Sequence, residues 1–237
     1  MPRTEQLPLG LRWPAWQRFE HFEPGDNALA LASCQRMAAG AEPWLLLSGP
    51  AGVGKTHLLL ATCQQATSLG AVAQYLSLRA LPPNRSAAIR GQGGSALVAL
   101  DDLDAIVGDR EAEHALFDLY NRCRADGARL LLATAAPLAA LDLVLPDLAS
   151  RLGAMTQLPL LGLDESARRM LTRKRAAARG IELDDSVLDW LFRNHARDLD
   201  SLAALIDQLD RATLAEHRRV TIPFLRQLLA RASMRSS

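Results

Sequence analysis

The sequence predicts an α/β fold in which a doubly wound domain with a five-stranded parallel sheet is followed by a small bundle of helices. Two observations carry this prediction. Short apolar runs alternate with helical patterns up to about residue 160, and three of the runs are apolar nearly throughout, which is typical of strands buried on both faces of a parallel sheet. After residue 162 only helical patterns follow, so the chain divides into an α/β domain and a helical domain.

The N-terminal segment, residues 1–20, differs from the rest of the chain. Proline and glycine alternate with its leucines and disfavour a helix, so we expect an extended or irregular segment. We expect the tryptophans at its end, Trp13 and Trp16, to cover the surface of the chain's own α/β domain. A helical pattern follows from about Pro24 to Gly40.

The α/β domain, residues 21–160, contains five strand-like runs bounded by turn residues. We expect the strands at Trp44–Ser48, Ala71–Ser77, Ala96–Leu100, Arg129–Thr134 and Ala154–Leu158. Helical patterns lie between them at Thr56–Leu69 and Glu111–Ala125.

The helical domain, residues 161–237, contains three or four amphipathic helices by pattern. Their ranges are Asp164–Arg179, Asp184–Asn194, Asp198–Ala215 and Ile222–Ala230. Thr221 is placed to cap the last of them, with Pro223 in its first turn.

Composition and charge exclude several classes of protein. The chain has 27 basic and 26 acidic residues, a net charge of +1, which argues against nucleic-acid binding through bulk charge. Its cysteines, Cys34, Cys63 and Cys123, are too far apart for a zinc module or a redox pair, which favours a reducing compartment. Since neither a bilayer-spanning run nor a signal core is visible, we expect a cytoplasmic protein without membrane contact.

The most specific motif is a glycine-rich loop between a buried strand and a helix. It matches G-x-x-x-x-G-K-[ST] at every required position and reads Gly49-Pro50-Ala51-Gly52-Val53-Gly54-Lys55-Thr56. Backbone N–H groups of such a loop and of the following helix bind phosphate oxygens. Lys55 is expected on the β- and γ-phosphates and the Thr56 hydroxyl on Mg²⁺. The motif therefore predicts a nucleotide site.

An apolar strand delivers two carboxylates at its C-terminal end, where ligands bind in open α/β sheets. Asp101 is expected to hold Mg²⁺ through water. Asp102, which we expect on the opposite side of the pleat, is the candidate to polarise the attacking water. We interpret Asp104 as a helix or turn cap.

Two arginines are further candidates. Arg151 precedes the last strand, at the edge of the domain, where an arginine can reach the phosphates of a neighbouring subunit. Arg197 stands just before the third helix of the bundle, where a cation could fold over a nucleotide. For both, an ordinary solvated arginine remains the alternative.

In this order, these elements resemble the AAA+ ATPases, and within them the proteins related to the bacterial replication initiator DnaA. The resemblance covers nearly the whole chain and is also carried by the runs Gln6–Leu11, Leu145–Leu152, Leu205–Ala212 and Thr221–Phe224. It implies an AAA+ P-loop domain with a helical lid. It also implies that Arg151 is an arginine finger acting in trans and that Arg197 is the second nucleotide sensor.

The resemblance gives further residues a role. Gln6, Leu7, Leu9 and Leu11 fall on the family's peptide for the β subunit of DNA polymerase III, the sliding clamp. A free extended segment with alternating apolar anchors suits a partner's groove, although packing on the chain's own domain is the alternative. Phe22, Gly25 and Asn27 fall in the segment that packs near the nucleotide base in the family.

The chain departs from the family pattern at the end of the fourth strand. The polar or acidic first-sensor position of the family falls on Ala135. Thr134 is its neighbour, but adjacent strand residues face opposite sides, so Thr134 is a doubtful substitute. This departure argues against strong turnover of ATP by the chain itself.

The leading hypothesis is a regulator that inactivates DnaA and so prevents re-initiation. It would bind ADP or ATP with Mg²⁺, bind the clamp, and stimulate hydrolysis of DnaA-bound ATP through Arg151. Because the sequence ends at Ser237, soon after the last predicted helix, we expect no separate DNA-binding domain and no sequence-specific DNA binding. A finger acting in trans requires an interface, so we expect a homo-oligomer.

The alternative is an autonomous AAA+ ATPase that acts as a helicase loader or another replication motor. A small-metabolite kinase is disfavoured by the helical bundle, and an adaptor that needs no nucleotide is disfavoured by the complete phosphate loop.

Overall fold

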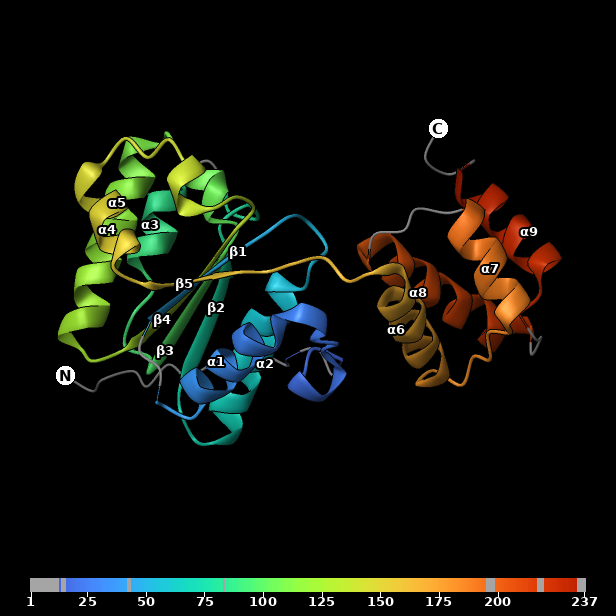
Figure 1. Cartoon of the computed structure of the whole chain (residues 1–237). Coiled ribbons are helices and arrows are strands. Elements are labelled where there is room, and N and C mark those ends of the chain that lie inside the picture. The colour runs from blue at the N-terminus through green and yellow to red at the C-terminus, as the bar shows by residue number, and fades with distance from the viewer. Residues whose placement is uncertain are drawn as a thin grey trace, which may run out of the picture. The chain divides into compact units, whose positions relative to one another are not determined.

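The computed structural model describes residues 13, 16–41, 44–82, 84–194, 199–216 and 220–233. These residues form two compact units, one ending at Leu160 and the other beginning at Leu161. Each is described by itself below (Figure 1).

The first unit is built on a parallel sheet of five strands. The strands are β1 (Trp44–Ser48), β2 (Ala73–Ser77), β3 (Leu97–Asp101), β4 (Arg129–Thr134) and β5 (Thr156–Pro159). Their spatial order is β2-β3-β4-β1-β5, so the strand that leads into the phosphate loop lies between β4 and β5. All four pairings are parallel, which confirms the predicted sheet.

Helices cover both faces of this sheet. One face carries α1 (Ala28–Ala38) and α2 (Lys55–Ser68), and the other carries α3 (Arg85–Arg90), α4 (Arg110–Ala125) and α5 (Pro146–Gly153) (Figure 1). Helices α3 and α5 were not predicted from the sequence, because six and eight residues are too few to show a clear helical period.

The central strands are apolar because both of their faces are buried. On β1, Leu46 packs toward the α3–α5 side, whereas Leu45 and Leu47 pack toward α1 and α2. All three leucines are fully buried. The α/β arrangement therefore follows from strands that must bury every side chain.

The N-terminal end of the described chain packs on its own domain, as predicted for the tryptophans. Trp13 lies against the core on the α1–α2 side. The ring of Trp16 stacks on His21, with 4.0 Å between ring centroids. The helix expected from Pro24 opens as a short 3₁₀ turn at Gly25–Asn27 before α1 begins.

The second unit contains, among the described residues, four helices around a separate apolar core. They are α6 (Glu165–Ala177), α7 (Asp185–Asn194), α8 (Leu199–Glu216) and α9 (Ile222–Ser233). Asp164 caps α6 by accepting a hydrogen bond from the Ala167 N–H at 2.7 Å. The expected Thr221 cap is present, since its hydroxyl oxygen accepts from the Phe224 N–H at 3.4 Å.

Ion pairs connect the basic helix α6 and the turn after it to the other helices of this unit. Arg169 contacts Asp189 of α7 at 2.5 Å, and Arg179 contacts Asp207 of α8 at 2.5 Å.

No helix in the described part of the chain combines the length and the apolar character needed to cross a membrane.

Candidate functional site

The phosphate loop, residues 49–56, connects β1 to α2. All three of its glycines have positive φ, +154° at Gly49, +75° at Gly52 and +100° at Gly54, and α2 begins directly after Gly54. The Lys55 amine donates to the carbonyl oxygens of Gly49 at 2.6 Å and Pro50 at 2.8 Å. The loop therefore closes on itself around the lysine, at the N-terminus of a fourteen-residue helix.

Close contacts leave no room for a side chain at two glycines of the loop, Gly49 and Gly54. A Cβ at Gly49 would lie 2.6 Å from the carbonyl oxygen of Leu160. A Cβ at Gly54 would lie 2.7 Å from the ring of Phe22. Phe22, which belongs to the segment that the resemblance places near the nucleotide base, thus packs directly on the loop, and Asn27 of the same segment is buried.

Asp101 ends β3 directly opposite Thr56. The Thr56 hydroxyl donates to Asp101 Oδ2 at 2.6 Å, and the Tyr75 hydroxyl donates to the same oxygen at 3.2 Å. The carboxylate is almost fully buried, and this burial raises its pKa, with the Thr56 hydrogen bond opposing the rise. A hydroxyl beside a buried carboxylate is a donor set that suits Mg²⁺.

Asp102 does not occupy the position that strand alternation predicted. It follows the last residue of β3 and has φ +58°, so the alternation of faces ends before it. Its carboxylate accepts from the Ser77 hydroxyl at 2.8 Å and pairs with Arg79 at 3.4 Å. Asp102 is therefore held toward the end of β2, while Asp101 is held toward Thr56.

Asp104 is not the cap that the sequence analysis expected. It lies within the 3₁₀ helix Leu103–Ile106, and its carboxylate accepts from the Ala135 N–H at 3.0 Å and pairs with Arg79 at 2.6 Å. Asp104 thus connects the acidic loop to the end of β4. Only the tertiary structure brings these groups together, because 31 residues separate Asp104 from Ala135.

Thr134 lies on the face of β4 that strand alternation predicted. Its neighbours on that side, Leu130 and Leu132, pack toward α3–α5, whereas Asp101 contacts Thr56 on the α2 side. Thr134 is fully buried, and its hydroxyl makes no hydrogen bond to any residue that the structure describes. Its side chain is therefore on the wrong side of the sheet to act together with Asp101.

Arg151 lies in the last turn of α5 and is exposed. Its guanidinium carbon is 5.9 Å from the ring centroid of Tyr120, a residue of α4, which is within the range of a cation–π contact. Tyr120 in turn packs edge-on against Trp44, with 4.3 Å between ring centroids. The arginine is therefore presented on the surface of the domain, at the side opposite α1 and α2.

Several predicted site residues lie outside the described residues. These are Arg197 and the four residues of the clamp peptide, Gln6, Leu7, Leu9 and Leu11.

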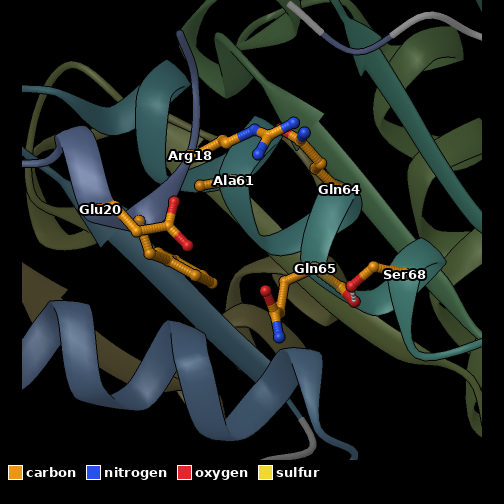
Figure 2. A pocket seen from close by; sticks show the side chains of 7 residues that line it. Arg18, Glu20, Ala61, Gln64, Gln65 and Ser68 are labelled. Carbon is orange, nitrogen blue, oxygen red and sulfur yellow. Dashed lines mark hydrogen bonds between the residues drawn. The ribbon is translucent and has the colours of Figure 1, made fainter. Parts of the chain in front are cut away.

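A cavity of about 140 Å³ lies between the N-terminal segment and α2 (Figure 2). It is lined by Arg18, Phe19, Glu20, Ala61, Gln64, Gln65 and Ser68. Its α2 residues begin more than one helical turn beyond Lys55, so the cavity is separate from the phosphate loop.

Comparison with known proteins gives matches to both units. Residues 164–229 match the family model described as "Hda, lid domain". Domain III of the replication initiation protein DnaA from Thermotoga maritima superposes with a TM-score of 0.76 at 21% identity, covering 92% of this chain and 97% of that one.

Two further structures share the fold at greater chain length. AMPPCP-bound DnaA from Aquifex aeolicus matches with a TM-score of 0.68 and 20% identity over 84% of this chain and 66% of that one. The RuvB Holliday junction branch migration motor of Thermotoga maritima matches with a TM-score of 0.61 and 17% identity over 86% of this chain and 67% of that one. The chain thus spans about two thirds of these longer proteins.

These matches extend over the α/β unit and the helical second unit. The fold class predicted from the sequence, an AAA+ α/β domain with a helical lid, is confirmed. The second unit thus resembles the Hda lid domain, and the chain shares its fold with DnaA.

Proposed function

We propose that this chain is a nucleotide-dependent replication regulator that inactivates DnaA. The observation that carries the proposal is the match of residues 164–229 to the Hda lid domain. The DnaA-like fold of the whole chain supports a place in replication initiation.

The chain's own nucleotide site would bind ADP or ATP. The loop N–H groups and Lys55 would hold the phosphates, and the N-terminus of α2 favours their negative charge. Thr56 and Asp101, whose Oγ1 and Oδ2 atoms are 2.6 Å apart, would hold Mg²⁺, with Asp101 acting through water. The metal, when bound, would neutralise charge on the phosphate oxygens.

Arg151 would act outside the chain's own site. It is exposed at the end of α5, and a guanidinium in this position can enter a neighbouring subunit and stabilise the charge that develops on the transferred phosphoryl group. Tyr120 would hold it until that partner is bound. This step requires DnaA to bind across the face that presents Arg151.

Two further parts of the proposal concern residues outside the described part of the chain. Gln6, Leu7, Leu9 and Leu11 would bind the β subunit of the sliding clamp, and Arg197 would contact the bound nucleotide. Clamp binding would place the regulator on replicated DNA. The chain would also form homo-oligomers in which one protomer's nucleotide site faces another's α5.

Weak turnover by the chain itself is part of the proposal. Asp102 is held by Ser77 and Arg79, and Ala135 offers no side chain that could contact a phosphate. In this view Asp102 polarises water only after it leaves these partners. The regulator therefore depends on its finger more than on its own hydrolysis.

The test is the rate at which DnaA loses ATP in the presence of DNA-loaded clamp. We expect this chain to accelerate the loss, and Arg151→Ala to reduce the acceleration by about 10³-fold or more, the size of effect seen when an arginine finger is removed. Arg124→Ala, which removes an exposed arginine from the end of α4, is the matched control and is expected to retain full acceleration. Leu9→Ala combined with Leu11→Ala is expected to remove the part of the acceleration that depends on the clamp.

Full acceleration by the Arg151→Ala protein would contradict the finger mechanism. Absence of any acceleration by the unmodified chain, together with strong ATP hydrolysis stimulated by single-stranded DNA, would instead favour the helicase loader or another replication motor.

A further inference from the structure

Helix α4 buries a carboxylate that the nucleotide site does not use. Glu113, in the first turn of α4, is fully buried. Its Oε1 accepts from the Gly108 N–H at 2.9 Å and the Val144 N–H at 3.2 Å, and its Oε2 accepts from the Leu145 N–H at 2.8 Å. A buried carboxylate is costly unless such donors satisfy it, so these three hydrogen bonds fix its surroundings closely.

The three donors belong to two segments that matter for the proposed function. Gly108 lies in the loop that leaves β3 after Asp101 and Asp102. Val144 and Leu145 come immediately before α5, the helix that carries Arg151. Glu113 therefore joins the loop behind the nucleotide site to the start of the finger helix.

The start of α5 has no cap of its own. Leu145 occupies the N-cap position and makes no side-chain hydrogen bond there. In a capping box, a glutamate three residues into the same helix would accept from the N-cap N–H. Here Glu113 does so from α4, so the direction in which α5 starts depends on α4 rather than on the α5 sequence.

Helix α4 also holds the other end of α5. Tyr120, about two turns after Glu113, carries the Arg151 guanidinium over its ring. Between these points, Leu148 and Leu152 are fully buried in the core and fix how deeply the helix sits. Apolar burial has no preferred direction. The hydrogen bonds of Glu113 are directional, and they therefore set the orientation of α5.

We propose that Glu113 is a positioning residue for the arginine finger: its carboxylate orients α5, and through α5 it places Arg151 for the active site of the partner ATPase. This inference rests on the proposed function. A misplacement of about 1 Å can cost two orders of magnitude in rate even when every catalytic group is present, so a support of this kind has a measurable effect.

The test compares Glu113→Gln with Glu111→Gln in the full-length chain. An amide at position 113 keeps the size of the side chain but replaces one acceptor oxygen with a donor, so it cannot serve Val144 and Leu145 together. Glu111 lies in the same turn of α4 but is exposed and accepts from the Ser86 hydroxyl of α3. It is the matched control. Glu113→Asp, which keeps the charge and shortens its reach, is the second variant.

The first measurement is amide hydrogen exchange, resolved to Val144 and Leu145. Losing one hydrogen bond to a charged acceptor should speed exchange there by about tenfold or more. The second measurement is the concentration dependence of DnaA-bound ATP hydrolysis. The maximal rate should fall toward that of Arg151→Ala while the half-saturating concentration and the chain's own ADP affinity stay unchanged, and Glu113→Asp should change both measurements less.

In an Arg151→Ala background, Glu113→Gln should have no further effect on the maximal rate, because the positioned group is already gone. Unchanged exchange at Val144 and Leu145, or full hydrolysis despite faster exchange, would overturn the assignment. Faster exchange throughout the sheet with loss of ADP binding, in both the Gln and Asp variants, would show a general structural role and also overturn it. If Arg151→Ala itself keeps full acceleration, the finger mechanism fails, and the exchange measurement still decides whether Glu113 holds α5.

Discussion

Thr134→Val is expected to stabilise the α/β unit, which is unusual for a change at the end of a central strand. Thr134 is fully buried, and its hydroxyl has no hydrogen-bond partner among the described residues. Valine has nearly the same shape, so the change replaces an unsatisfied polar group with a methyl group and leaves no cavity. Burying a hydroxyl without a partner costs about 1–3 kcal/mol in protein mutational data, so we expect a gain of about 1 kcal/mol.

The chain offers a matched control in Thr62→Val. Thr62 is also fully buried in the same unit, but its hydroxyl donates to the Leu58 carbonyl oxygen at 2.6 Å. Removing that hydrogen bond is expected to lower the free energy of unfolding by about 1 kcal/mol. The two variants, identical in chemistry, should therefore differ by about 2 kcal/mol, in opposite directions from the unmodified protein.

The assay is amide hydrogen exchange of β4 (Arg129–Thr134) under native conditions, because exchange through global opening of the α/β unit reports its free energy of unfolding separately from that of the lid. ADP affinity is measured in parallel and should be unchanged for Thr134→Val. Destabilisation of 1 kcal/mol or more would refute the reasoning, because it would mean that the hydroxyl is satisfied. If the unmodified chain hydrolyses ATP, loss of this hydrolysis in Thr134→Val would show that Thr134 serves as the first sensor after all.

Two other predictions concern the proposed nucleotide site. Gly49→Ala places a Cβ 2.6 Å from the Leu160 carbonyl oxygen, so we expect about 1–3 kcal/mol of destabilisation, measured by urea unfolding, and weaker ADP binding, measured by isothermal titration. Gly162→Ala is the control, because nothing lies within 4 Å of a Cβ at that position, and it should change neither quantity by a measurable amount. Burial raises the pKa of Asp101 above its ordinary value of 3.8, so the folded chain keeps this proton to higher pH than the unfolded chain does. The contribution of Asp101 to stability is therefore present at low pH and is lost as pH rises through the pKa of the folded state. Over that pH range, Asp101→Asn should become more stable relative to the unmodified protein. The measurement is urea unfolding without Mg²⁺ or nucleotide. A relative stability that stays flat or falls with pH would contradict a raised pKa.

Local patterns predicted the three central strands to within one residue: β3 (Leu97–Asp101), buried along its whole length, begins and ends one residue later than predicted. The ranges of β1 and β4 match the prediction to the residue, because strands enclosed by helices on both faces must be apolar along their whole length. β5, at the edge of the sheet, begins two residues later than predicted, since the preceding helix α5 extends to Gly153. The phosphate loop was also predicted in full, because its geometry depends on the residue types of one continuous segment.

Contacts between distant segments could not be predicted in the same way. Nothing near Asp104 in the sequence indicates that its carboxylate binds the Ala135 N–H, or that Asp102 is held by Ser77 and Arg79. A left-handed residue at the end of a strand gives no periodic signal, so the orientation of Asp102 was predicted wrongly.

The sequence by itself determined the fold class, the phosphate loop and the acidic end of β3, because each depends on residues that are neighbours along the chain and on one repeating pattern of burial. The tertiary structure alone decided which carboxylate meets which partner. Asp101 contacts Thr56 of α2, and Glu113 of α4 holds the start of α5, across 45 and 32 residues respectively. A hydrogen bond requires its two groups to lie within about 3 Å in a definite direction, and only the packing of helices on the sheet brings such distant groups that close.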